Sequence, residues 1–179
     1  MQIQLNGESL NIDNIWQVAH TDTKVELAVS ARAKVQSSRD YIMKKLKNNE
    51  VVYGVNTGFG ALSSVRISDE KLIELQKNLI RSHCCGVGEN FTKEESRAIM
   101  LLRANALARG HSGIRPEVIE KILEFLNHDI IPVIPQQGSV GASGDLAPLS
   151  HLALAIIGEG EVWEDGKVVP VETVLKKKN

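Results

Sequence analysis

A tripeptide in the last quarter of the chain, Ala142-Ser143-Gly144, has the residue types needed to build an electrophile from its own backbone. Glycine lacks a Cβ, so the chain can bend sharply there at low steric cost. Attack of the Gly144 nitrogen on the Ala142 carbonyl carbon would close a five-membered ring. Loss of one water at that step, and of the Ser143 hydroxyl as a second water, would leave an exocyclic methylidene group. Such a ring would do chemistry that otherwise needs an added cofactor, because natural side chains include no strong electrophile.

The residues around this tripeptide are typical of a tight turn that leads into a helix. Gly138 and Gly141 precede Gly144 at intervals of three residues, so the loop can approach other backbone closely. Asp145 stands where a helix N-cap belongs, and the Leu-Ala-Pro-Leu sequence after it predicts a first helical turn that tolerates proline. The partial positive charge of that helix terminus would lie beside the ring. A glycine-rich turn that caps an ordinary buried helix explains the same residues, so spacing alone leaves both interpretations open.

Three segments of the chain resemble motifs of the aromatic amino-acid ammonia-lyases, and most closely those of the histidine ammonia-lyases. Residues 138–151 have the sequence GSVGASGDLAPLSH, residues 52–60 have VYGVNTGFG, and residues 82–88 have SHCCGVG. The first is highly specific, and the three occur in the family's order. The resemblance covers essentially all 179 residues.

The resemblance implies an internal cofactor and a catalytic base. Ala142, Ser143 and Gly144 would become the family's methylidene-imidazolone group, MIO, by autocatalysis and without an external cofactor. Loss of ammonia from an α-amino acid requires a better leaving group, which the electrophilic ring supplies by bonding the amine. It also requires removal of a weakly acidic β-proton, and the resemblance assigns that task to Tyr53, whose phenol must first lose its own proton.

A core tyrosine with a hydrogen-bonded hydroxyl is the competing interpretation of Tyr53. Gly54, Gly58 and Gly60 flank it and predict a mobile loop that closes over a ligand, which favours the catalytic role. In the same loop, Asn56 is a candidate substrate-binding residue. An asparagine that stabilises the turn explains Asn56 as well.

His83 is the candidate residue for substrate selection. It shares one face of a predicted helix with Leu72, Leu75 and Leu79, so we expect its side chain to point inward. A single histidine on an apolar face is more often a core residue, but the resemblance places His83 where family members contact the substrate side chain. A histidine suits a polar ring there, which predicts L-histidine as the small-molecule substrate and non-oxidative deamination to trans-urocanate and ammonia. Tyrosine, used by a tyrosine ammonia-lyase or an aminomutase, is the alternative.

Other polar and sulfur-bearing residues have lesser roles. Gly60 and Asp145 are candidates for supporting the ring, and N-capping explains Asp145 as well. Cys84 and Cys85 are adjacent, which argues against a disulfide between them, and we expect small buried residues with free thiols. No metal site is expected, because metal-ligand spacing is absent among His111, His128 and His151.

The bulk composition describes an ordinary globular chain. It is 42% hydrophobic and 24% charged, with a net charge of −1. This balance gives no indication of a nucleic-acid or membrane partner. No segment approaches the ~18 uninterrupted apolar residues of a transmembrane helix, and the first residues lack the pattern of a signal peptide. We therefore expect a cytoplasmic protein.

The sequence predicts helices with small β-hairpins. Asn6-Gly7 indicates a hairpin over residues 1–12, and Asp165-Gly166 indicates a second over residues 161–171. A glycine-rich loop covers residues 51–66. Five helices are predicted: 22–48, Ser68 to near Gly86, Thr92 to Gly110, a segment that begins at Pro116, and 146–157. Asp22 would cap the first of them. The last is apolar on nearly all faces.

The resemblance implies a mainly α fold. Residues 1–145 would form a compact helical domain that carries the MIO group, and residues 146–179 would begin the family's long helical bundle. Family members are much longer, and their later helices supply an arginine for the substrate carboxylate and help to build a homotetramer. We therefore expect this chain to be inactive alone, and either to self-associate through the apolar faces of 146–157 or to have a disordered last helix and tail. A non-catalytic module that assembles with a separate bundle chain is a further interpretation.

Overall fold

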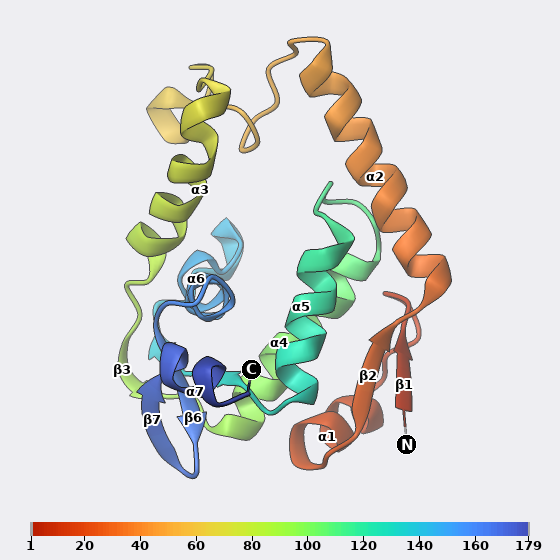
Figure 1. Cartoon of the computed structure of the whole chain (residues 1–179), viewed down its shortest axis with the longest axis vertical. Coiled ribbons are helices and arrows are strands. Elements are labelled where there is room, and N and C mark those ends of the chain that lie inside the picture. The colour runs from red at the N-terminus through yellow and green to blue at the C-terminus, as the bar shows by residue number, and fades with distance from the viewer. Residues whose placement is uncertain (1, 179) are drawn as a thin grey trace.

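The computed structural model describes residues 2–178, which form a mainly helical fold with three small sheets (Figure 1). The predicted fold class is thus confirmed. The helices are α1 (Ile12–His20), α2 (Val29–Lys47), α3 (Asp69–His83), α4 (Lys93–Ala108), α5 (Pro116–Asn127), α6 (Leu146–Ile156) and α7 (Val171–Lys178). The strands are β1 (Gln2–Leu5), β2 (Lys24–Leu27), β3 (Val87–Asn90), β4 (Ile131–Pro132), β5 (Pro135–Gln137), β6 (Glu161–Glu164) and β7 (Lys167–Pro170). Two 3-10 turns, Gly60–Leu62 and Gly141–Ser143, precede α3 and α6.

The hydrophobic core is centred on α4 and α5, both of which the sequence predicts correctly. α4 begins at a capping box: the Thr92 side chain accepts a hydrogen bond from the Glu95 N–H, and the Glu95 carboxylate accepts one from the Thr92 N–H. α5 begins with Pro116 in its first turn. The largest fully buried side chains of the two helices are Met100, Leu101, Ile119 and Leu126.

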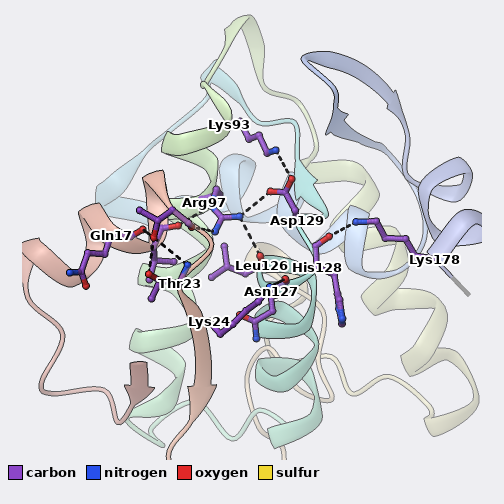
Figure 2. Close-up of polar contacts among 12 residues, drawn as sticks. Gln17, Thr23, Lys24, Lys93, Arg97, Leu126, Asn127, His128, Asp129 and Lys178 are labelled. Atoms are coloured by element: carbon purple, nitrogen blue, oxygen red, sulfur yellow. Dashed lines mark hydrogen bonds and ion pairs between the residues drawn. The ribbon is translucent and has the colours of Figure 1, made fainter. Parts of the chain in front are cut away.

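A buried arginine ties three helices together at one end of this core (Figure 2). Arg97 of α4 is only 6% exposed. Its guanidinium donates hydrogen bonds to the carbonyl oxygens of Val18, Thr21 and Leu126, which belong to the C-terminal ends of α1 and α5. It also pairs with Asp129, at 3.0 Å between Nη1 and Oδ1. Arg97 therefore satisfies carbonyl groups that the ends of α1 and α5 leave without an intrahelical partner.

The hairpin predicted over residues 1–12 is wrong. β1 pairs in parallel with β2, which lies beyond α1 in the sequence. Asn6 turns the chain after β1, because its side-chain oxygen accepts hydrogen bonds from the backbone N–H groups of Glu8 and Ser9. The chain then enters α1, a helix that the sequence analysis did not anticipate.

The single helix predicted over residues 22–48 is also wrong, because the chain forms β2 before α2. Asp22 lies in the irregular segment between α1 and β2 rather than at a helix N-cap. β1 pairs with one edge of β2, and the Asn127 side chain occupies the other. Its amide accepts a hydrogen bond from the Val25 N–H at 2.9 Å and donates one to the Val25 carbonyl at 2.8 Å. These tertiary contacts outweigh the local helix propensity of a short segment.

α2 and α3 extend away from the core and are joined by the loop of residues 48–68 (Figure 1). α2 buries Ala31 and Val35. None of the described side chains of α3 is fully buried, and Ile73 is 71% exposed. Both helices therefore present apolar surface that the described part of the chain leaves open.

The C-terminal part matches its predicted hairpin. β6 and β7 pair antiparallel around Asp165-Gly166, and β4 adds a third strand. The predicted helix over 146–157 is present as α6, although only Ala147, Pro148, Leu152 and Ala155 are buried there. The lysines near the end lie in α7, where Lys176 pairs with Glu172. No helix within residues 2–178 is long and apolar enough to cross a bilayer.

Two glycines with similar backbone angles allow the close contact between α2 and the α4–α5 turn to be tested. Gly110 has φ +76°, and a Cβ there would lie 2.9 Å from the carbonyl carbon of Lys34. Gly166 has φ +73° with open space around it. We expect Gly166→Ala to lower the free energy of unfolding by about 1 kcal/mol, the cost of a left-handed alanine. Gly110→Ala should lower it by about 1–3 kcal/mol more, because backbone atoms must move. Urea unfolding of both variants measures the difference, and equal losses would contradict it.

Candidate active site

The tripeptide lies in an exposed, tightly turned loop. Gly141–Ser143 form a 3-10 turn in which the Ser143 N–H donates to the Val140 carbonyl at 2.8 Å. The Gly144 N–H donates to the Gly141 carbonyl at 3.1 Å. Gly144 itself is left-handed, with φ +96°, and a Cβ added there would meet no atom within 4 Å. The position therefore favours glycine for its backbone conformation rather than for lack of space.

Asp145 occupies the N-cap position of α6 but does not cap it with its side chain, so that part of the prediction is wrong. Its backbone is left-handed, with φ 54° and ψ 44°, instead of the extended conformation typical of an N-cap. The Asp145 carboxylate instead accepts a hydrogen bond from the Ser139 hydroxyl. This contact joins the residues on either side of the tripeptide loop. Support of the ring by Asp145 stays a prediction.

The segment that carries His83 packs against the loop that carries the tripeptide. A Cβ added at Gly138 would lie 3.2 Å from the Gly86 Cα and 3.2 Å from the Ala147 Cβ. The Gly86 N–H donates a hydrogen bond to Nε2 of His151 on α6 at 3.3 Å. β3 and β5, which continue these two segments, pair antiparallel. Two of the three sequence motifs are therefore brought together by the fold.

His83 ends α3 in a half-buried position. Its Nδ1 lies 2.9 Å from the Leu79 carbonyl oxygen and 3.0 Å from the Ser82 hydroxyl, so that nitrogen is engaged within its own helix turn. Leu72, Leu75 and Leu79 are also half-buried, so the face that they share with His83 is covered only in part.

The two cysteines differ from each other. Cys84 is half-buried, and burial, with smaller contributions from Cys85 and Glu159, raises the pKa of its thiol to about 11. It is therefore protonated near neutral pH. Cys85 is exposed, so the expectation that both are buried is wrong for this residue, which lies in the irregular segment after α3. No group of three or more His, Cys, Asp or Glu residues within 2–178 is arranged to hold a metal ion.

Tyr53 lies in the loop between α2 and α3 and is 64% exposed. Its ring meets Phe59 edge-on, with 5.9 Å between ring centroids. The Asn56 side chain is buried, donating to the Glu50 carbonyl at 2.9 Å and accepting from the Val52 N–H at 2.8 Å. These two bonds hold the loop's own conformation.

The loop of Tyr53 is the one motif that the structure leaves apart from the others. Gly60, with φ +57°, begins the exposed turn at the far side of this loop. Within residues 2–178, no hydrogen bond joins residues 51–66 to the loop of residues 138–145. The assignments of Tyr53, Asn56 and Gly60 to the site stay predictions.

His151 is the neighbour of the site that the sequence analysis missed. It was considered there only as a metal ligand, yet it lies at the end of the GSVGASGDLAPLSH motif and one helical turn after Ala147. Burial lowers the pKa of the His151 imidazole, and the nearby Glu161 carboxylate opposes that shift. Its position inside the most specific motif was the signal that could have identified it.

The chain is similar to a known family over nearly its whole length. The model of the family described as aromatic amino acid lyase matches residues 10–179. The chain belongs to this family. Among curated relatives, it is 54% identical to the histidine ammonia-lyase of Geobacillus sp. strain WCH70 over 173 residues, which are 97% of this chain and 34% of the relative. It is 49% identical to that of Staphylococcus aureus over 179 residues, 100% of this chain and 36% of the relative. The chain thus spans about a third of the length of these aromatic amino acid lyases.

Solved structures show the same fold. Tyrosine aminomutase from Streptomyces globisporus matches with a TM-score of 0.90 and 40% identity, over 99% of this chain and 33% of its own. Histidine ammonia-lyase from Trypanosoma cruzi matches with a TM-score of 0.89 and 39% identity, over 99% of this chain and 34% of its own. This part of the lyase fold therefore occurs in proteins with different activities, so the fold alone does not select a substrate.

Proposed function

We propose that the chain carries the electrophile-forming part of a histidine ammonia-lyase, which converts L-histidine to trans-urocanate and ammonia. The observation that carries the proposal is the packing of Gly86 against Gly138, which places the segment of His83 beside the tripeptide loop. This packing supports a site that combines a residue for substrate selection with a precursor of the electrophile. The curated relatives, about half identical over the whole chain, support histidine as the substrate.

The backbone of Ala142-Ser143-Gly144 is suited to forming the MIO group. The 3-10 turn brings the Gly144 nitrogen to 3.1 Å from the Gly141 carbonyl oxygen, one peptide before the carbonyl carbon that it would attack. Gly144 is left-handed, with φ +96°, a conformation that glycine adopts at low steric cost. Once formed, the group supplies an electrophile that improves the substrate amine as a leaving group.

The other proposed roles belong to residues outside the tripeptide. Tyr53 removes the β-proton of the substrate after its exposed loop moves over the site. His83 contacts the substrate ring, Asn56 contacts the substrate within the closed loop, and Gly60 and Asp145 support the ring. We further propose that the whole protein is a cytoplasmic homotetramer, whose additional helices complete the site and hold the substrate carboxylate.

Tyrosine is the second candidate substrate. Its support is the close structural match to a tyrosine aminomutase, together with a His83 side chain that can hydrogen-bond a phenol as well as an imidazole. Comparing turnover of histidine and tyrosine by a chimera, in which this chain replaces the matching third of the Staphylococcus aureus relative, separates the two.

We expect the isolated chain to form little of the ring and no urocanate. The tripeptide is exposed, and the space where a Cβ of Gly144 would lie is open, whereas cyclisation needs a compressed loop. Intact mass spectrometry should give the mass of the unmodified sequence, and an assay with L-histidine should show no product. A deficit of two waters would contradict the first expectation, and turnover by the purified chain would contradict the second. Co-purification with a large helical partner would instead support an assembly module.

A further inference from the structure

His151 joins two segments that are distant in sequence. The backbone N–H of Gly86, three residues after His83, donates to Nε2 of His151 at 3.3 Å. There is little space at Gly86, since a Cβ there would lie 3.1 Å from this nitrogen and 3.1 Å from the Cβ of Pro135. Because Gly86 has no side chain, its backbone can approach the His151 ring. A larger residue at this position would push the backbone away from the ring.

The direction of this hydrogen bond fixes the protonation state of the ring. A backbone N–H can only donate, so Nε2 must carry a lone pair and the imidazole must be neutral, with its proton on Nδ1. A protonated ring would present an N–H to the Gly86 N–H, and the two would repel. The contact therefore exists only while His151 is neutral.

The groups around His151 leave its neutral form favoured. Burial is the main influence and lowers the pKa, while Glu161 on β6 raises it less. On α3, Arg81 is already paired with Glu159 at 2.6 Å, and His83 is the last residue of the helix, followed by Cys84. β4 contributes Ile131 and Pro132, which do not titrate. The acidic groups of α5 are paired with Arg32 or Lys121, namely Glu117, Glu120 and Glu124.

We infer that His151 is a positioning residue that holds the His83 segment against α6 and the tripeptide loop, through its neutral Nε2. The link to catalysis rests on the proposed function, but the contact does not. Because the folded-state pKa is lowered, the contact is fully formed above the ordinary histidine pKa of about 6.5 and is lost as the pH falls through the lower, folded-state pKa.

The test follows the Gly86 amide in the 179-residue chain by hydrogen exchange, as a protection factor corrected for the intrinsic pH dependence of exchange. In the unmodified chain, protection is compared at pH 7.5 and at a lower pH where the His151 ring resonances show the imidazole to be protonated, and it should be about fivefold or more lower at the second. In His151→Leu, the protection factor of the Gly86 amide should be about fivefold to tenfold lower at pH 7.5, which is the contribution of one hydrogen bond. It should show no further pH dependence. His151→Gln should keep protection at both pH values, because its amide oxygen accepts without titrating in this range.

Two controls make the result decisive. His111→Gln changes an exposed histidine and should leave Gly86 as in the unmodified chain. The ¹⁵N resonances of the His151 ring show directly which nitrogen carries the proton, so the inference stays testable if His151→Leu fails to fold. A protonated Nε2 at pH 7.5, or the same pH dependence in His151→Gln, would overturn it. Neither readout depends on lyase activity, so failure of the proposed function leaves both measurements interpretable.

Discussion

Replacing Ser143 with alanine is expected to abolish the methylidene group and with it the proposed lyase activity. The Ser143 hydroxyl leaves as the second water, so alanine at this position can form no methylidene. We expect the chimera with the Staphylococcus aureus relative to have the mass of its sequence minus two waters per chain, and Ser143→Ala never to show the second loss of water. Loss of a residue that acts as part of a catalytic unit costs about 10⁴-fold or more in other enzymes, and we expect at least about 10³-fold in turnover here.

Ser112→Ala is the matched control, because Ser112 is exposed in the α4–α5 turn and outside the three motifs. It should leave both the mass deficit and turnover unchanged. Full activity of Ser143→Ala would show that the electrophile does not come from this tripeptide, whatever the mass of the unmodified protein.

Replacing Arg97 with methionine is expected to cause a large loss of stability. Methionine keeps much of the apolar volume but leaves the carbonyl groups of Val18 and Thr21 without the Arg97 donor, and that of Leu126 with only the Asp129 N–H. Asp129 is half-exposed and keeps its pair with Lys93, so the main cost is the loss of donors to buried carbonyl groups, about 1–3 kcal/mol for each group left unsatisfied. We therefore expect the free energy of unfolding, measured in urea, to fall by about 2–5 kcal/mol.

Arg103→Met provides the comparison on the same helix. Arg103 is half-buried, burial lowers the pKa of its guanidinium, and within residues 2–178 its side chain makes no ion pair. Its replacement should change the free energy of unfolding by no more than about 0.5–1 kcal/mol. If the two variants lose the same free energy of unfolding, the hydrogen bonds of Arg97 do not add to the stability of the fold.

Local signals in the sequence predicted much of the fold. The Thr92 capping box, Pro116 and the Asp165-Gly166 turn each act within a few residues, and each is followed by the expected element. The N-terminal region failed because its structure is set by distant partners. β2 depends on β1 and on the amide of Asn127, about 100 residues away, so no local pattern could indicate a strand there.

The candidate site was predictable in its residues but not in its contacts. The tripeptide, Tyr53 and His83 stand out through motif and spacing. The packing of Gly86 on Gly138 and the bond to His151 depend on how α3 and α6 approach each other, which the sequence does not express locally. Asp145 was misjudged because a sequence pattern gives the cap position without its left-handed backbone.

The Asn127 amide on β2 also bears on how copies of this chain can associate. The free edge of a two-stranded sheet normally offers a template on which a further strand can add, and this is a route to fibrous aggregates. Asn127 already occupies the N–H and the carbonyl of Val25 at the middle of that edge. Strand addition is therefore blocked at the β2 edge of this sheet.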